Sequence, residues 1–324
     1  MAATKDEGTL ARIKRGDKNV INDIISVFKQ EPKFKPNGYS VTGFRYPKQN
    51  SVAYVKFGPL KQIAAEVQNH EYAFGTFEKM SPNQTRGIRI PEIYHTFNIG
   101  EELNQKMFII MEYIDGKTLA ELVEEHGCET TKKTHEGSIA RAIRLLISIN
   151  APKDQGPGPV GGGRIRHPLF KNETSYLAYS SVDALKKYLN QVSTCRNKAA
   201  PTVHLKEEKL CFYYSDFFEG NFIFTDSGEI CLIDFDNAGF LPQSFMIYEL
   251  AESNWDPGRW IKNNIMLSLR EDELKAVEKN LEAMRNIFYL LAIGCRVGWC
   301  PAAKETVAGI EFSRGDVICT ARYR

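Results

Sequence analysis

Apolar residues in the first third of the chain follow an alternating pattern that is typical of strands. Two runs, YSVTGFRY at 39–46 and VAYVKF at 52–57, alternate closely enough to predict two strands joined by a turn. A stronger apolar run at 107–113 predicts a further strand, and a shorter run at 97–100 precedes it. This part of the chain is therefore expected to form a sheet.

Elsewhere, apolar residues recur every three or four positions, which is the pattern of helices with one buried face. The predicted helices are 20–28, 138–149, 181–192, 245–253, 261–267 and 271–293. No segment repeats, which excludes a repeat array. With 324 residues, the chain is long enough for two lobes or one large domain.

One stretch in the second half, LCFYYSDFFEGNFIFTDSGEICLIDFDNAGFLP, combines strand-like runs with polar residues at their ends. The runs 222–224 and 230–233 flank a turn that contains glycine, which predicts a hairpin. The hairpin is expected to return Asp234 to the vicinity of Asn221. Asp216 lies five residues before Asn221.

These three polar side chains suit phosphoryl transfer from Mg-ATP. Asp216 is expected to accept or orient the proton of an attacking hydroxyl, and Asn221 and Asp234 to supply hard oxygen ligands to Mg²⁺ on the phosphates. Position and charge carry most of such catalysis. The alternative is that all three are ordinary turn residues, because Asp and Asn are common at strand ends.

The same stretch resembles the catalytic segment of the aminoglycoside phosphotransferase and choline kinase-like family, which has a protein-kinase-like fold. The family pattern is His-x-Asp, four residues, Asn, a hairpin, and Ile-Asp followed by Trp or Phe. The residues that match it in order are Asp216, Gly220, Asn221, Ile233, Asp234, Phe235, Ala238 and Gly239. Tyr214 occupies the histidine position, where the family residue mainly braces the loop.

This resemblance implies an α+β, bilobal protein-kinase-like fold. The N-terminal lobe is expected to contain an antiparallel sheet with one or two helices, and the larger, mainly helical C-terminal lobe to contain the catalytic hairpin. The implied boundaries are 1–115 for the nucleotide-binding lobe, with a leader and helix in 1–35, and 116–324 for the catalytic and substrate-binding lobe. The implied cofactors are ATP and Mg²⁺, and the implied acceptor is a small-molecule hydroxyl.

Lys56 closes the second predicted strand, at the position where kinase-like enzymes hold the phosphates of ATP. In these enzymes a glutamate of the following helix pairs with the lysine. Glu71 fits the family spacing better, and Glu66 is the alternative. Otherwise, Lys56 is an edge-strand residue that faces water, and either glutamate is a solvated charge.

The run 107–113 with the residues that follow it resembles the family's hinge, which implies that backbone groups near Glu112 and Ile114 recognise adenine. The phosphate-covering loop between the first two strands is a poor match, because Gly43 is its only glycine. Arg45, Lys48 and Ser51 are its candidate phosphate contacts. Together with Tyr214, this loop leaves open a second function: a catalytically weak, kinase-shaped binding or scaffolding protein with a protein partner.

Composition excludes several classes of partner. The formal charge of +2 gives no reason to expect nucleic acid or a membrane surface as a partner. The N-terminal residues contain no apolar secretory signal, and the apolar run at 287–294 is too short to span a membrane, so a cytoplasmic protein is expected. Seven scattered cysteines favour reduced thiols.

Two expectations concern the acceptor. No dense acidic run occurs near the C-terminal helices, so a polycationic acceptor such as an aminoglycoside is not expected. The Gly/Pro-rich segment 156–166 lacks the features of a phosphate-binding loop and is predicted to be a mobile insertion. Arg164, Arg166 and His167 are then hypothesised to border the acceptor pocket.

Overall fold

The computed structural model describes residues 7–34, 40, 42–101, 104–206 and 208–295. The chain forms two compact units. The first is Met1–Glu121 with Gly220–Asp236, and the second is Leu122–Glu219 with Asn237–Arg324. The segment that holds the predicted hairpin thus groups with the strand-rich first part of the chain.

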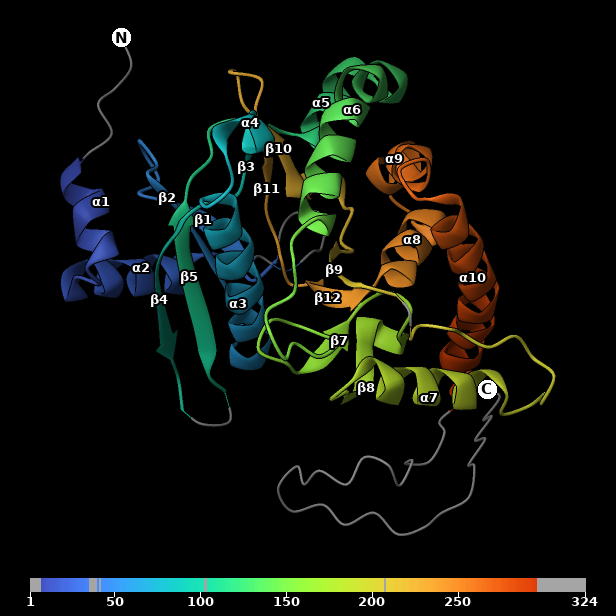
Figure 1. The fold of residues 1–324 in the computed structure, drawn as a ribbon. Helices are drawn as coiled ribbons and strands as arrows, with labels where there is room; N and C mark the ends of the chain where they lie inside the picture. Colours follow the sequence, from blue (N-terminus) through green and yellow to red (C-terminus); the bar gives the residue numbers. More distant parts are fainter. Residues whose placement is uncertain (1–6, 35–39, 41, 102–103, 207, 296–324) are drawn as a thin grey trace. The chain divides into compact units, whose positions relative to one another are not determined.

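A four-stranded antiparallel sheet in the order β1-β2-β5-β4 organises the first unit. Its strands are β1 (Gly43–Tyr46), β2 (Ala53–Pro59), β4 (Ile93–Ile99) and β5 (Lys106–Glu112). Figure 1 shows α1 (Glu7–Lys14) and α2 (Lys18–Gln30) along one face of the sheet and α3 (Leu60–Phe77) along the other. The predicted α+β fold with an N-terminal antiparallel sheet is confirmed.

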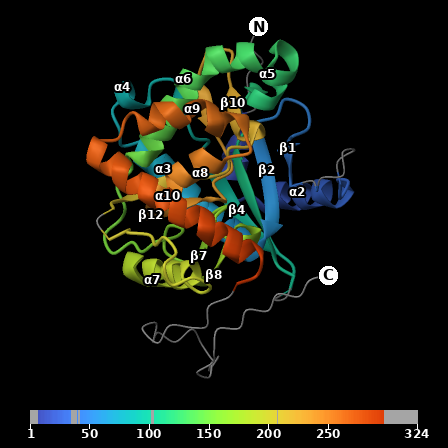
Figure 2. The same ribbon diagram turned by 90° about the vertical axis from the view of Figure 1, so that its right-hand side faces the viewer.

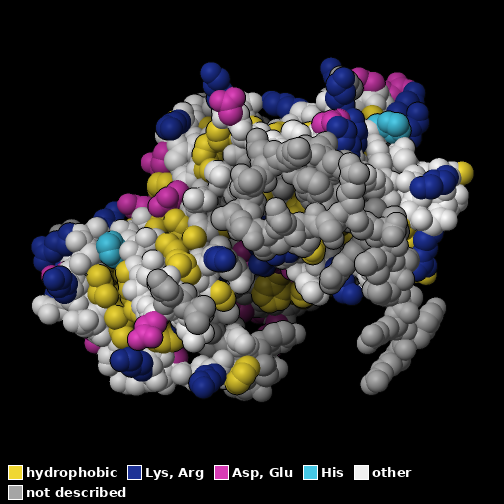
Figure 3. Space-filling view, turned by 90° about the horizontal axis from the view of Figure 1, so that it is seen from below, with side chains coloured by type: hydrophobic (Ala, Val, Ile, Leu, Met, Phe, Trp, Pro, Cys, Tyr) yellow, Lys and Arg dark blue, Asp and Glu magenta, His cyan; other side chains and the backbone are white. Residues whose placement is uncertain are grey.

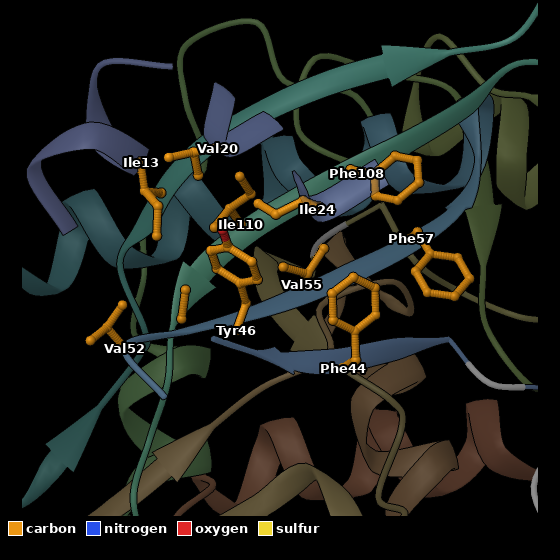
Figure 4. Close-up of a cluster of buried hydrophobic side chains, with 11 residues drawn as sticks. Ile13, Val20, Ile24, Phe44, Tyr46, Val52, Val55, Phe57, Phe108 and Ile110 are labelled. Atoms are coloured by element: carbon orange, nitrogen blue, oxygen red, sulfur yellow. The ribbon is translucent and has the colours of Figure 1, made fainter. Parts of the chain in front are cut away.

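Each face of this sheet has its own core. The cluster in Figure 4, on the side of α1 and α2, consists of Ile13, Val20, Ile24, Phe44, Tyr46, Val52, Ala53, Val55, Phe57, Phe108 and Ile110. The buried residues of the cluster against α3 are Ile63, Val67, Ile109 and Met111. Successive residues of a strand point to opposite faces. Lys56 lies between two members of the first cluster, so its side chain points toward α3.

A second, smaller sheet contains the predicted hairpin. Its strands, in spatial order, are β3 (Ile88–Arg89), β11 (Ile230–Leu232), β10 (Phe222–Phe224) and β6 (Lys117–Thr118). β10 and β11 are antiparallel, with Phe222 opposite Leu232. The residue before β6 is Gly116. A larger residue does not fit at this position, because its Cβ would lie 2.5 Å from the Phe224 carbonyl oxygen. The short helix α4 (Pro82–Thr85) precedes β3.

The second unit is mainly helical. Its helices are α6 (Cys128–Ile147), α7 (Val182–Ser193), α8 (Gln243–Glu252), α9 (Asp256–Met266) and α10 (Glu271–Ala292), and α5 (Leu119–His126) crosses the unit boundary. α10 packs against α7 and α8, as Figure 2 shows. α6 begins ten residues before the predicted start, because its first half is polar and buries only Thr131. Apolar periodicity cannot reveal such a segment.

Two pairs of strands complete the second unit. They are β7 (Arg164–Arg166) with β8 (Thr174–Ala178), and β9 (Leu210–Tyr214) with β12 (Ala238–Pro242). A 3₁₀ turn at Lys171–Glu173 lies between β7 and β8, and another at Glu219–Asn221 lies between β9 and β10. Gly158, in the segment predicted to be a mobile insertion, exchanges two 2.8 Å backbone hydrogen bonds with Phe240. The segment is therefore anchored to β12. A Cβ on Gly239 would collide with the Gly158 carbonyl, which explains this glycine.

Other sequence-based expectations concern thiols and surface charge. The five cysteines in the described ranges are free thiols, and Cys300 and Cys319 lie outside these ranges. Where the structure is described, no helix is long and apolar enough to cross a membrane. On the face drawn in Figure 3, basic and acidic side chains are interspersed among the coloured residues. The cytoplasmic location and the absence of nucleic-acid partners stay predictions.

Candidate functional site

Lys56 forms the centre of a buried charge cluster in the first unit. Its Nζ lies 2.7 Å from Glu66 Oε1 and 2.8 Å from Asp234 Oδ1. Only 14% of the Lys56 side chain and 1% of the Glu66 side chain are exposed. The alternative of a lysine that faces water is therefore excluded. The structure pairs Lys56 with Glu66 and leaves Glu71, the preferred partner, exposed to solvent.

The helical geometry of α3 explains this correction. Its buried positions are Ile63, Glu66, Val67, Asn69, His70, Ala73 and Phe77, which recur every three or four residues. Glu71 follows Glu66 by five residues, which rotates it about 140° around the helix axis. The spacing of Glu66 from Ile63 and Val67 is the sequence signal that identifies it as the buried glutamate.

Burial and neighbouring charges shift the protonation equilibria of this cluster. Burial alone lowers the pKa of Lys56, but the charges of Glu66 and Asp234 outweigh it and raise that pKa above its usual value. Burial raises the pKa of Glu66 to about 7, with Lys56 opposing the shift and Asp234 adding to it. Asp236 contributes a third carboxylate and accepts a hydrogen bond of 2.5 Å from Gln62 Nε2. With one lysine among three carboxylates, the fully ionised cluster carries a net charge of −2, which a divalent cation would balance.

Backbone hydrogen bonding holds the two candidate metal ligands side by side. The Ile233 N–H donates to the Asn221 carbonyl at 3.1 Å, so Asp234 directly follows a residue that is fixed to Asn221. Within the described ranges, no group of three or more His, Cys, Asp or Glu side chains could hold a metal ion. The side chains of Asn221 and Asp234 offer a metal one amide oxygen and one carboxylate group. This donor set fits Mg²⁺, which typically binds one or two protein carboxylates and completes its shell with phosphate oxygens and water.

The predicted hinge residues, Glu112 and Ile114, differ in whether their backbone groups already form hydrogen bonds. The Glu112 N–H already donates to Glu92 O at 2.9 Å, and the Glu112 carboxylate lies 2.7 Å from Arg89 Nη2. The Glu112 side chain also lines a cavity of about 340 Å³ that none of the candidate catalytic or metal-binding residues borders. Ile114 is buried, and no backbone hydrogen bond of the described residues involves it. Ile114, unlike Glu112, therefore keeps its backbone hydrogen-bonding groups out of the backbone hydrogen bonds of the described residues.

The loop between β1 and β2 uses its polar side chains for internal contacts. Lys48 Nζ lies 2.8 Å from Glu31 Oε1. The Ser51 hydroxyl donates to Pro47 O at 2.9 Å, and Arg45 Nη1 donates to the Tyr113 hydroxyl at 3.1 Å. The candidate phosphate contacts of this loop are thus all engaged within the protein.

Asp216 lies in the second unit, directly after β9. Its Oδ1 accepts a hydrogen bond of 3.2 Å from the Phe218 N–H, which fixes the carboxylate within its own loop. Tyr214, at the family's histidine position, is 1% exposed and packs edge-on against Phe217, with ring centroids 6.2 Å apart. The tyrosine thus braces the loop by packing.

Charges from distant segments act on Glu249 of α8, which the sequence did not reveal. Glu249 is 4% exposed, and burial raises its pKa to about 8, with the charges of Asp216 and Glu173 adding to the shift. The prediction that the acceptor is not a polycation depended on the lack of a dense acidic run in the sequence, and it stays a prediction. An exposed edge-to-face aromatic pair, Phe218 and Trp255, lies in the same unit, with centroids 5.1 Å apart.

The hypothesis on Arg164, Arg166 and His167 needs correction for the histidine. His167 is fully buried, and its ring nitrogens contact Phe245 O at 3.1 Å and the Leu169 N–H at 3.1 Å. It is a core residue and cannot border a pocket. Arg164 Nε donates to a backbone carbonyl.

Arg166 is linked to Glu173 through the side chain of Asn237. Its Nε donates to Asn237 Oδ1 at 3.0 Å, and Asn237 Nδ2 donates to Glu173 Oε2 at 3.3 Å. Glu173 and its neighbour Asn172 both have left-handed backbone angles, with φ of 53° and 55°. Successive left-handed residues are typical of tight turns between antiparallel strands such as β7 and β8. Arg166 therefore braces, through Asn237, the turn that carries Glu173.

Comparison with known proteins was made for sequence and structure. A profile of the phosphotransferase enzyme family matches residues 80–262, more than half of the chain, which includes Asp216, Asn221 and Asp234. Among curated protein sequences, none matches.

Several solved structures are similar at low sequence identity. The crystal structure of aminoglycoside phosphotransferase APH(4)-Ia is 14% identical, covers 76% of this chain and 79% of that chain, and has a TM-score of 0.44. Aminoglycoside-3'-phosphotransferase of type VIII is 14% identical, with coverages of 81% and 98% and a TM-score of 0.41. The gentamicin complex of APH(2")-IIa is 16% identical, with coverages of 77% and 89% and a TM-score of 0.40.

Proposed function

Because this chain belongs to the phosphotransferase enzyme family, we propose that it transfers the γ-phosphate of ATP to a hydroxyl of a small molecule. The observation that carries this proposal is the position of Lys56, whose amine contacts Glu66 and Asp234 together. A buried lysine fixed between two carboxylates, with Asn221 bonded to the residue before Asp234, supplies the contacts that Mg-ATP requires.

Each residue then has a defined part in the reaction. Glu66 holds the Lys56 amine toward the phosphates, and Asn221 and Asp234 would hold Mg²⁺. When bound, the metal neutralises charge on the β- and γ-phosphates. Asp216 accepts or orients the proton of the acceptor hydroxyl, because the Phe218 N–H fixes its carboxylate within the loop.

The second unit supports a narrower proposal: the acceptor alcohol carries an amine. The charges of Asp216 and Glu173 both raise the pKa of the buried Glu249, so an ammonium group placed near these carboxylates would relieve repulsion between like charges. Phe218 and Trp255 add exposed aromatic faces, to which cations are attracted.

An acceptor screen tests this proposal. With Mg-ATP, we expect amino alcohols to be phosphorylated with kcat/KM at least about tenfold above neutral polyols of similar size, because about 1.4 kcal/mol of differential binding gives that ratio. Glu249→Gln should reduce the ratio and leave the use of neutral polyols unchanged. Equal use of both classes would remove the amine proposal and keep phosphotransfer. No phosphorylation of any acceptor would instead favour the alternative.

That alternative is a kinase-shaped binding protein with little activity. The contacts of Arg45, Lys48 and Ser51 favour it, since each of these side chains already bonds to another group of the protein. The buried ion pair of Lys56 weighs against it, because a scaffold does not need a buried charge cluster that destabilises the fold if one partner is lost.

A matched pair of variants separates the two glutamates of α3. Glu66→Gln should lower kcat/KM for ATP by about tenfold to 10²-fold, because Lys56 would be held by Asp234 alone and shift from the phosphates. Glu71→Gln should leave kcat/KM within about twofold, since Glu71 is exposed on another face of the helix. Steady-state kinetics at saturating acceptor measure both values. A larger loss in Glu71→Gln than in Glu66→Gln would overturn the assignment of Glu66.

A further inference from the structure

Helix α3 holds the segment that follows Asp234 at more than one point. Asn69 is fully buried, and its Nδ2 donates a 3.1 Å hydrogen bond to the carbonyl oxygen of Phe235. The ring of His70, the next residue of α3, lies 5.0 Å from the ring of Phe235. About two turns toward the start of the helix, the Gln62 amide donates a hydrogen bond to the Asp236 carboxylate. Both the backbone and the side chain of Phe235 are therefore fixed by the helix.

Asp234 itself has a strained backbone. Its φ of 62° lies in the left-handed region, which residues with a Cβ adopt only at a cost in free energy. Such a conformation persists only where its surroundings impose it. The hydrogen bond of Ile233 to Asn221 fixes the residue before Asp234, and the bond from Asn69 fixes the residue after it. The direction of the Asp234 carboxylate thus depends on both bonds.

The same helix also controls the lysine. Glu66, which holds Lys56, lies three residues before Asn69 on the buried face of α3. Since Lys56 Nζ is 2.8 Å from Asp234 Oδ1, the helix fixes both members of this contact, one through a side chain and one through a backbone carbonyl. Because one helix carries both Glu66 and Asn69, it keeps Lys56 and Asp234 at a fixed distance from each other.

We propose that Asn69 is a positioning residue for the metal site: it orients the Asp234 carboxylate through the Phe235 carbonyl without touching metal or nucleotide. The inference rests on the proposed function, in which Asp234 holds Mg²⁺. Residues that orient metal ligands typically contribute about 10- to 100-fold to metal affinity. The effect of losing Asn69 should therefore appear in the metal dependence of nucleotide binding.

The test uses the full chain, ATP and MgCl₂. Asn69→Leu removes the donor and replaces the amide oxygen and nitrogen with two bulkier methyl groups. We expect the Mg²⁺ concentration that gives half of the metal-dependent gain in ATP affinity to rise at least about tenfold, with ATP binding in EDTA unchanged. Calorimetry measures both. Asn69→Ser, whose hydroxyl is too short to reach the carbonyl, provides the same readout with a smaller change in core packing.

Asn280→Leu is the matched control. Asn280 is also fully buried, and its Nδ2 also donates to a backbone carbonyl at 3.1 Å, that of His204 in the second unit. Both leucine variants should lower the melting temperature, but only Asn69→Leu should change the Mg²⁺ requirement. An unchanged Mg²⁺ requirement in the Asn69 variants overturns the inference. Absence of any Mg²⁺ effect on ATP binding in the wild-type protein would instead refute the proposed function.

Discussion

Asp216→Asn is expected to lower kcat by about 10²- to 10⁴-fold and to leave the affinity for Mg-ATP unchanged. The asparagine keeps an oxygen that can accept the Phe218 N–H, so the loop should retain its conformation. What is lost is the carboxylate that accepts or orients the proton of the acceptor. Single-turnover kinetics with a saturating acceptor, together with calorimetric titration of Mg-ATP, separate the chemical step from nucleotide binding.

The same variant has a second readout that does not depend on finding an acceptor. Burial, and then the charge of Asp216, raises the pKa of Glu249 to about 8. A carboxyl with a raised folded-state pKa binds more protons in the folded state than in the unfolded state, so its contribution to stability falls as pH rises from about 5 to 8. Asp216→Asn should lower the pKa of Glu249, so that stability decreases less between about pH 5 and 8. Melting temperatures across this pH range measure the slope.

Two outcomes would contradict the role of Asp216. Full activity in Asp216→Asn would show that another group serves the acceptor hydroxyl. An equal loss of nucleotide affinity and turnover would show that the substitution damages the fold or the nucleotide site instead of the proton step.

Short-range periodicity accounts for the parts of the candidate site that the sequence revealed. Asn221 and Asp234 lie at the two ends of one hairpin, so the turn alone brings them together. Strand alternation likewise directs Lys56 toward α3 once its neighbours are buried. Both inferences depend on patterns of two to a few residues, which a sequence displays directly.

Buried polar residues explain why the partner of Lys56 was misjudged. The inner face of α3 includes Glu66, Asn69 and His70, each fully buried. Hydrophobic periodicity is the main sign of a helix face, and polar residues on the inner side interrupt it. The helix is therefore recognisable, but its inner face is identified only when the spacing of Glu66 from Ile63 and Val67 is considered as well. The rule that polar residues on an inner face need a partner would have pointed to Glu66.

Tertiary proximity explains what no local pattern could reveal. Glu173 lies on the turn after β7, Asp216 follows β9 and Glu249 belongs to α8, and only packing brings their charges into range. Arg166 and Asn237, which brace the turn of Glu173, are similarly separated along the chain. The carboxylates that we propose for the acceptor therefore required the structure, whereas the sequence already singled out Lys56, Asn221 and Asp234.

Asp234→Ala is expected to abolish the Mg²⁺-dependent part of ATP binding and to lower turnover by more than about 10³-fold, because it removes a metal ligand and the contact with Lys56. The wild-type protein should bind ATP more tightly with MgCl₂ than with EDTA. The variant should bind equally in both. Titration of each protein with ATP under the two conditions, followed by heat or by melting temperature, measures the difference.

Controls must separate the lost carboxylate from the left-handed backbone at this position. Alanine tolerates a φ of 62° poorly, whereas asparagine adopts it more readily, so Asp234→Asn should melt close to the wild type and still lose most of the metal dependence. Asp226→Ala, at the exposed turn of the same hairpin, should change neither property. A metal response retained in Asp234→Ala would place the Mg²⁺ site elsewhere. No metal response in any of the four proteins would favour the kinase-shaped binding protein, because Lys56, Glu66 and Asp234 would then form a structural ion cluster.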